Sequence, residues 1–171
     1  MGPDITVIIE DKVWLRVLPE SEALAQQAAV AALKSEGWGR RKVAIDITLL
    51  ADRAQRVLNR DWRGKDKPTN VLSFPLESPE MKVPRGRARQ LGDMTLARET
   101  MVREAKEQGK SLDAHFVHLV THGVLHLLGY DHMTAREAKV MEGKEIRLLV
   151  KSGYGDPYAD TDSTKLRAAL K

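Results

Sequence analysis

Cysteine is absent from this chain of 171 residues. Without thiols the protein can form no disulfide bond, and it can offer no thiolate ligand to a metal ion. Histidine is then the natural nitrogen donor for any zinc site. A chain without cysteine also fits the reducing environment of the cytoplasm, which is the expected location.

Long hydrophobic runs are also missing. No stretch approaches the roughly 20 apolar residues that a membrane-spanning helix needs, and Met1–Asp4 lacks the features of a signal peptide. We therefore expect no membrane contact. With 42% hydrophobic residues and no internal repeat, the chain is expected to fold as one domain with a substantial core.

The apolar periodicity predicts an α+β fold. The expected strands are Ile5–Ile9, Val43–Leu49, Val71–Phe74 and Leu91–Thr95. The expected helices, about five, are Glu20–Ser35, Ala51–Leu58, Ala97–Gln108, a buried central helix from Ser111 or Asp113 to Leu128, and a last one from a capping box at Thr134 to about Lys151. Residues 1–155 should form the domain, and residues 156–171 should form a weakly ordered tail.

The histidines provide the main functional signal, because all five fall between positions 115 and 132. His122 and His126 are four residues apart, so a helix places both imidazoles on one face. On the same helix His132 would lie about 9 Å further along the axis. Gly129 can end the helix and turn the chain back, so that His132 closes on the same ion. Three neutral nitrogen ligands with an open fourth position are typical of catalytic zinc.

A second pairing remains open at this stage. His118, His122 and His126 form one stripe about 12 Å long, of which only adjacent pairs can chelate a single ion. His118 with His122 is therefore a rival to His122 with His126, although Gly129 and His132 favour the latter. His115 and His118 would then support the ligands, face RNA or pack in the core.

The spacing from His122 to His132 also resembles the zincin signature of metalloproteases. In that signature a glutamate follows the first histidine and acts as general base, whereas position 123 here is glycine. A protease is therefore a distant third hypothesis, since it would need a base from elsewhere. Asp131 could be a base, or it could fix the tautomer of a ligand histidine.

The net charge is +4, and the basic residues cluster. The clusters are Arg40–Lys42, Arg63–Lys67 and Lys82–Arg89. Each could be a solvated loop or a contact to the phosphates of a nucleic acid. Arg63 lies in a turn-forming segment that leads into a strand, where a guanidinium can hold a phosphate by two parallel hydrogen bonds.

Several long motifs together resemble one known family. They are Trp62–Phe74, Leu91–Asp93, Arg98–Ala105 and His122–His132. With these motifs the chain is similar, from roughly Ile5 to Gly155, to the YbeY family of bacterial endoribonucleases, known as rRNA maturation factors. The departures are the tail beyond about Tyr158, Met94–Leu96 in place of a more aliphatic strand, and a variable loop at Lys82–Arg89.

The resemblance implies a single α+β domain with a small mixed four-stranded sheet and a zincin-like central helix. One zinc ion would be held by His122, His126 and His132, and Arg63 would be the functionally important arginine. The expected activity is cleavage of single-stranded RNA in 16S rRNA 3′-end maturation and ribosome quality control. The partners would be the 16S rRNA precursor and the small ribosomal subunit, with no role for DNA.

The residues also suggest how such an enzyme would work. Zinc can lower the pKa of a bound water and polarise a phosphate oxygen, while Arg63 stabilises transition-state charge. The nucleophile is left open between water and the RNA 2′-hydroxyl. The expected catalytic residues are Arg63 and Asp131, and the expected RNA-binding residues are Arg63, Lys65, Lys67, Arg85, Arg87 and Arg89. The alternative is a ribosome-assembly factor that binds RNA and in which zinc is structural.

Overall fold

Four strands form one mixed sheet at the centre of the computed structural model, which describes residues 2–159 and 169–170. They are β1 (Asp4–Ile9), β2 (Val43–Leu50), β3 (Val71–Pro75) and β4 (Arg89–Ala97). Their order is β1-β2-β4-β3, with β3 antiparallel to β4 and the other two pairs parallel. The expected mixed four-stranded sheet is confirmed, and β3 forms one of its edges.

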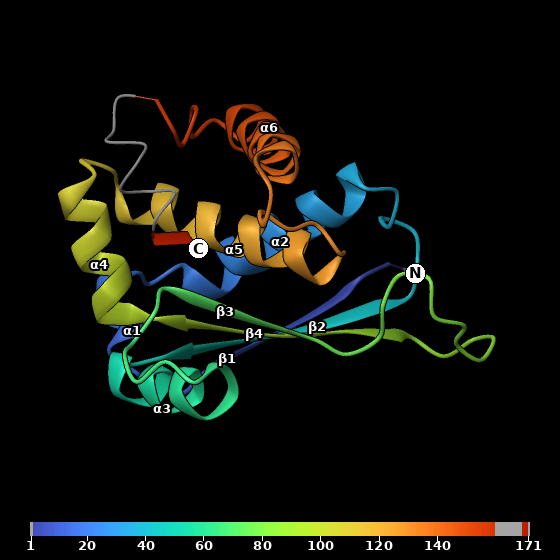
Figure 1. The fold of residues 1–171 in the computed structure, drawn as a ribbon, viewed down its shortest axis with the longest axis horizontal. Coiled ribbons are helices and arrows are strands. Elements are labelled where there is room, and N and C mark those ends of the chain that lie inside the picture. The colour runs from blue at the N-terminus through green and yellow to red at the C-terminus, as the bar shows by residue number, and fades with distance from the viewer. Residues whose placement is uncertain (1, 160–168, 171) are drawn as a thin grey trace.

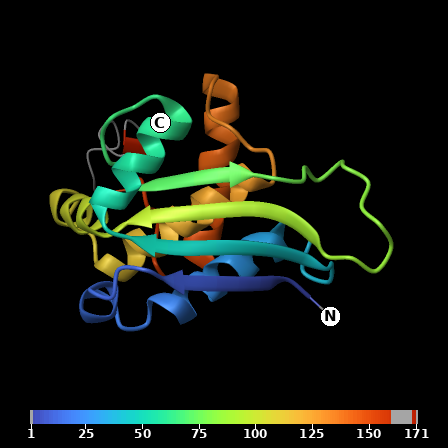
Figure 2. The same cartoon turned by 90° about the horizontal axis from the view of Figure 1, so that it is seen from below.

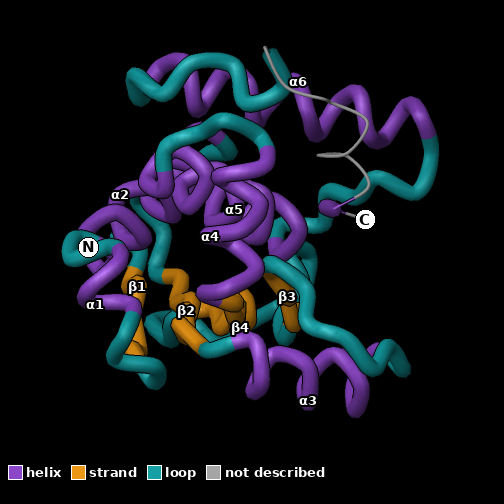
Figure 3. The backbone as a smooth tube through the Cα atoms, turned by 90° about the vertical axis from the view of Figure 1, so that its left-hand side faces the viewer, coloured by secondary structure: helices purple, strands orange, loops and turns teal. Residues whose placement is uncertain are grey.

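Helices cover both faces of the sheet unequally (Figures 1 and 3). The six in the described residues are α1 (Trp14–Val17), α2 (Ser21–Ser35), α3 (Asp52–Arg63), α4 (Arg98–Glu107), α5 (Leu112–Leu127) and α6 (Ala135–Lys151). The helices α2 and α5 lie on one face with α6 stacked outside them, whereas α3 lies on the opposite face, on the β3 side (Figure 2). The short α1 was not expected from the sequence, and α3 continues past Leu58 to Arg63.

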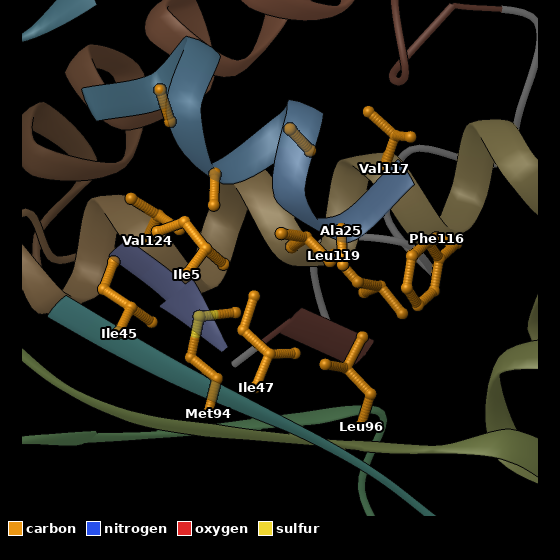
Figure 4. Close-up of a cluster of buried hydrophobic side chains, with 14 of the residues drawn as sticks. Ile5, Ala25, Ile45, Ile47, Met94, Leu96, Phe116, Val117, Leu119 and Val124 are labelled. Carbon is orange, nitrogen blue, oxygen red and sulfur yellow. The ribbon is translucent and has the colours of Figure 1, made fainter. Parts of the chain in front are cut away.

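The core lies between the sheet and the pair α2 and α5. Alternate residues of β2, including Ile45 and Ile47, point to this side, where they meet Leu119 and Val124 of α5 (Figure 4). Every residue of α5 from His115 to Leu125 is buried. The expectation of a buried central helix is therefore confirmed, and the side chains from His115 to Leu125 are held by packing.

The end of the chain is described only in part. Residues 160–168 and 171 of the expected tail lie outside the described residues. Of the residues that are described, Pro157 is buried and Tyr158 donates a hydrogen bond to Glu145 of α6. Within the described part of the chain, no helix has the length and apolar character needed to cross a bilayer.

Candidate metal centre

Three imidazole nitrogens converge at the C-terminal end of α5. His122 and His126 come from the helix, and His132 comes from the loop before α6. The Nε2 atom of His126 lies 3.0 Å from that of His122 and 3.1 Å from that of His132. In a tetrahedral site with zinc–nitrogen bonds of about 2.0–2.1 Å, ligand nitrogens stand about 3.3 Å apart. The three side chains can therefore hold one metal ion between them.

The turn that brings back His132 begins at Gly129, which has a φ of +99°. Its amide donates to the carbonyl of His126 at 2.9 Å, and the amide of Tyr130 donates to the carbonyl of Leu125 at 3.1 Å. These two bonds form a Schellman motif, which favours glycine at the left-handed position. The helix break that we predicted at Gly129 is therefore confirmed.

In two of these histidines, the ring nitrogen that faces away from the cluster, Nδ1, has a protein partner. The Nδ1–H of His126 donates to the backbone carbonyl of Tyr130 at 2.9 Å, and the Nδ1–H of His122 faces the carboxylate of Glu145 at 3.3 Å. With the proton on Nδ1, the lone pair of each Nε2 is free to coordinate a metal. Such partners fix both the tautomer and the ring orientation of a ligand.

The site disfavours the protonated form of His126 and of His132. Burial, followed by proximity to His122 and His132, lowers the pKa of His126 to about 4. Burial, followed by the same repulsion from His122, lowers the pKa of His132. For Glu145, burial would raise the pKa, but the hydrogen bonds from His118 and His122 outweigh it and hold the pKa below the usual range. An anionic carboxylate beside neutral imidazoles is the arrangement that a divalent cation requires.

His118 and His115 are directed away from the three converging nitrogens. The Nε2 atom of His118 lies 2.5 Å from Glu145, and its ring packs edge-on against Tyr158 with centroids 5.4 Å apart. The Nε2 atom of His115 lies 3.1 Å from Glu104. Both rings are completely buried, so neither faces RNA. Of the two pairings that the sequence left open, the geometry brings together His122 and His126.

Asp131 contacts neither of the neighbouring imidazoles through a hydrogen bond. Its carboxylate accepts one from the backbone amide of His132 at 2.8 Å. This bond shapes the loop that presents His132. The sequence suggested that Asp131 could fix the tautomer of a ligand histidine. In the structure, Glu145 does this for His122 and the Tyr130 carbonyl does it for His126.

The space beside Gly123 is filled by neighbouring side chains. A Cβ atom on Gly123 would come within 2.3 Å of Cε of Met94 and 3.2 Å of Oγ of Ser73. The helix α5 therefore packs closely on β3 and β4 at this point. A glutamate beside His122, as in the metalloproteases, would require the side chain of Met94 to move and Ser73 to give way slightly.

Sequence reasoning missed Glu145, whose exposed fraction is 1%. The signal that could have found it is its place in α6, where it shares an apolar stripe with Met141 and Leu148. A carboxylate on the inward face of an amphipathic helix must have partners, since an unpaired buried charge is costly. Nothing in the sequence, however, shows that these partners are histidines of α5.

Arg63 lies apart from the histidines, at the last position of α3 on the other face of the sheet. Its side chain is exposed, as are those of Lys65 and Lys67 in the following loop. The other expected RNA contacts lie in the loop before β4 and at the start of that strand. In the loop, Arg85 is exposed and Arg87 pairs with Glu77 at 2.7 Å. Arg89, the first residue of β4, donates to the backbone carbonyl of Ser78.

Comparison with known proteins agrees with this architecture. The family profile described as endoribonuclease YbeY matches residues 9–153. A protein named endoribonuclease YbeY from Paramagnetospirillum magneticum is 47% identical over 158 residues, which is 92% of this chain and 96% of that protein. The protein of the same name from Azorhizobium caulinodans is 48% identical, over 91% of this chain and 96% of its own length.

A solved structure resembles this chain at lower identity. The solution structure of TM1509 from Thermotoga maritima matches with a TM-score of 0.52 and 23% identity, over 92% of this chain and 97% of that one. At this identity the likeness concerns the fold. The sequence matches are much stronger and span almost the whole described domain, and on this basis the chain belongs to the endoribonuclease YbeY family.

Proposed function

We propose that this protein is a zinc-dependent endoribonuclease that cuts single-stranded RNA in the cytoplasm. Its substrate would be the 16S rRNA precursor on the small ribosomal subunit, in 3′-end maturation and quality control. The observation that carries the metal dependence is the convergence of three Nε2 atoms, together with the protein partners that engage Nδ1 of His122 and His126. The family supports the choice of RNA.

The donor set fits zinc. Three neutral imidazoles leave a fourth position for a ligand from solvent or substrate, as in catalytic zinc sites. A zinc ion bound there would supply Lewis-acid polarisation of a phosphodiester oxygen. The protein would contribute the rigidity of α5 and the fixed tautomers, since both Nδ1 protons are held by partners outside the cluster.

Arg63 would act on the same RNA from the other side of β3. The outer edge of β3 separates α5 from the end of α3, so a strand of several nucleotides that passes around this edge would meet both sites. A guanidinium suits a phosphate whose negative charge grows in the transition state. No carboxylate among the described residues competes for Arg63, because none forms an ion pair with it.

The direct test is cleavage of a defined single-stranded RNA before and after removal of the metal. A chelator should abolish cleavage, and zinc should restore it. The chelated protein should keep much of its affinity for RNA, because the basic residues do not depend on the ion. A chelated protein that cuts at the original rate would contradict the proposal. A 2′,3′-cyclic phosphate end would indicate attack by the 2′-hydroxyl.

Arg63→Ala tests the assigned arginine. At saturating RNA it should lower the cleavage rate on the order of a hundredfold or more, with a smaller effect on affinity and none on zinc content. The matched control is Arg85→Ala in the loop before β4, which should weaken binding and leave the saturated rate near normal. If Arg63→Ala cuts at the normal rate at saturation, this arginine serves only in docking.

The alternative is an assembly factor whose zinc is structural. It is favoured by one observation, that Gly123 and Asp131 supply no free carboxylate beside the cluster. In that case zinc removal would reduce folding stability and RNA affinity together. No preparation of the protein would then cut RNA by itself.

A further inference from the structure

The indole of Trp62 is exposed to an unusual degree. Its exposed fraction is 72%, whereas Trp14 in the core is completely buried. Exposure leaves most of a large aromatic surface in water, which costs free energy. A binding partner that covers the ring of Trp62 would remove this apolar surface from water.

The ring is nevertheless well positioned. Trp62 lies in the last turn of α3 and meets Phe74 of β3 edge-on, with centroids 6.3 Å apart and an interplanar angle of 69°. The helix ends at Gly64, which has a φ of +70°, and the following loop returns to α3, where the Asn59 amide donates to the carbonyl of Lys67 at 2.8 Å. Trp62 thus sits on a rigid element, with one contact to the sheet and much of its surface open.

The surroundings of Trp62 are positively charged. Arg56 pairs with Asp66 at 2.8 Å, and Arg60 pairs with Asp61 at 2.9 Å. These pairs use the two local carboxylates. The next cations along the chain are Arg63, Lys65 and Lys67, and each is exposed without a carboxylate partner among residues 2–159 and 169–170.

An aromatic platform beside unpaired cations matches single-stranded nucleic acid better than a protein surface. Bases stack on aromatic rings, and phosphates bind the neighbouring cations. An apolar protein partner would cover the ring but would leave three cations desolvated without anions. Charge complementarity therefore favours a polyanion with flat bases.

The edge strand β3 connects this platform to the metal centre. The Oγ atom of Ser73 donates to the carbonyl of Gly123 at 3.2 Å, next to the ligand His122. The following residue, Phe74, points to the opposite face and contacts Trp62. Two consecutive residues of one strand thus touch the two sites.

We propose that Trp62 is a stacking platform for a base of the bound RNA, on the far side of β3 from the histidine cluster. This inference rests on the proposed ribonuclease function and adds the route that the RNA takes over the protein surface. The bound RNA runs from the histidines around the outer edge of β3 to Trp62. Its phosphates contact Arg63, Lys65 and Lys67.

The test measures binding of a labelled single-stranded RNA by fluorescence anisotropy, before cleavage sets in, for Trp62→Ala and Trp62→Phe. Loss of one stacked base typically corresponds to about a five- to hundredfold change in affinity. We expect Trp62→Ala to lose this much, while Trp62→Phe retains most of the affinity because it keeps a ring. The matched control is Val57→Ala, which removes another exposed apolar side chain of α3, with an exposed fraction of 42%, and should change nothing.

A second measurement tests the path. A dinucleotide that occupies only the histidine cluster should be cut equally well by Trp62→Ala and the unchanged protein, whereas a long RNA should need Trp62. RNA binding should also quench tryptophan fluorescence in the unchanged protein and much less in Trp62→Phe.

Several outcomes would overturn the inference. Normal affinity of Trp62→Ala for long RNA would exclude the ring from RNA binding, and equal losses in the Ala and Phe variants would exclude stacking. An equal loss for dinucleotide and long RNA would exclude the path around β3. If the unchanged protein neither bound nor cut RNA, the proposed function itself would fail, and this inference with it.

Discussion

The carboxylate of Glu145 receives contacts from three aromatic side chains. His118, His122 and the hydroxyl of Tyr158 all meet its Oε1 atom, at 2.5, 3.3 and 3.0 Å. Only His122 belongs to the converging cluster, so Glu145 would influence a bound metal through this ring. His118 and Tyr158 fix the carboxylate in turn, and the orientation of one ligand therefore depends on residues from α5, α6 and the segment after α6.

Replacement of Glu145 should weaken metal binding without removing a ligand. Loss of a carboxylate that orients a ligand histidine typically costs 10- to 100-fold in metal affinity, and we expect about this loss for Glu145→Ala. Glu145→Gln should lose less, because its amide oxygen can still accept from Nδ1. Zinc affinity is measured by competition with a chelator of known strength, with Glu107→Gln on the exposed side of α4 as control. An unchanged zinc affinity in Glu145→Ala would show that the carboxylate only fills space.

The three converging histidines should behave differently from His118. Changing His122, His126 or His132 to Ala should greatly reduce the zinc content of the purified protein, since each removes one of three ligand atoms. His118→Ala should keep one zinc per chain, because its Nε2 faces Glu145. Metal analysis after dialysis distinguishes these results. Full occupancy in His132→Ala together with loss in His118→Ala would show that the other pairing is used.

At the scale of elements, β2 and β4 bring two carboxylates together on the face of the sheet away from α5. Asp46 and Asp93 are direct partners in the parallel register. Burial, followed by repulsion from Asp46, raises the pKa of Asp93. The folded protein therefore binds this proton more tightly than the unfolded chain does. Stability from Asp93 is fully present below the unfolded pKa of about 3.9 and is lost as the pH rises through the folded value.

Asp93→Asn should consequently raise the melting temperature at neutral pH, because it removes a charge that the folded state disfavours. The gain should shrink as the pH falls below about 4, where the aspartate is protonated in both states. Thermal unfolding of both proteins across this range gives the measurement. Asp4→Asn on the edge strand β1 is the control for a general effect of charge. A gain that stays constant from neutral to acid pH would rule out the titration of Asp93 as its source.

The elements that could be predicted from sequence are those whose pattern is local. The apolar face of β2, the capping box at Thr134 and the turn at Gly129 each need only neighbouring residues, and all are present. The single turn of α1 is too short to show a period. The extension of α3 to Arg63 carries little apolar pattern, because its last turns are mostly charged. Such segments take their structure from packing.

In the candidate site, too, the residues that could be predicted are those with a local sequence pattern. The three ligands were visible because helical spacing and one glycine place them together within eleven residues. Glu145 lies 23 positions beyond His122, so no local rule connects the two. The position of Arg63 was hidden for a further reason, since the side of the sheet on which α3 lies depends on the whole topology.

At the scale of the whole molecule, the candidate metal centre adjoins the core. Its ligand helix α5 is buried from His115 to Leu125 and packs against α2, β3 and α6. Binding of an ion to these side chains therefore favours the folded state over the unfolded chain.

Metal removal should accordingly lower the melting temperature. An ion that binds only the folded protein stabilises it by about 2.7 kcal/mol at 100 times its dissociation constant. Calorimetry of the zinc-loaded and chelated protein should show this difference, and His126→Ala should show none. Identical melting temperatures for the loaded and chelated forms would mean that the site is not coupled to folding.

The order of these parts along the chain has a consequence for biosynthesis. All four strands end by Ala97, whereas the groups that hold or orient the histidines lie between His118 and Tyr158. At synthesis rates of about 5–20 residues per second, the roughly 60 residues from Ala97 to Tyr158 take about 3–12 s. A nascent chain thus contains all four strand sequences for seconds before the last of these groups is made. Under the proposed function, the cutting centre stays unassembled during that time, next to a ribosome whose own RNA belongs to the substrate class.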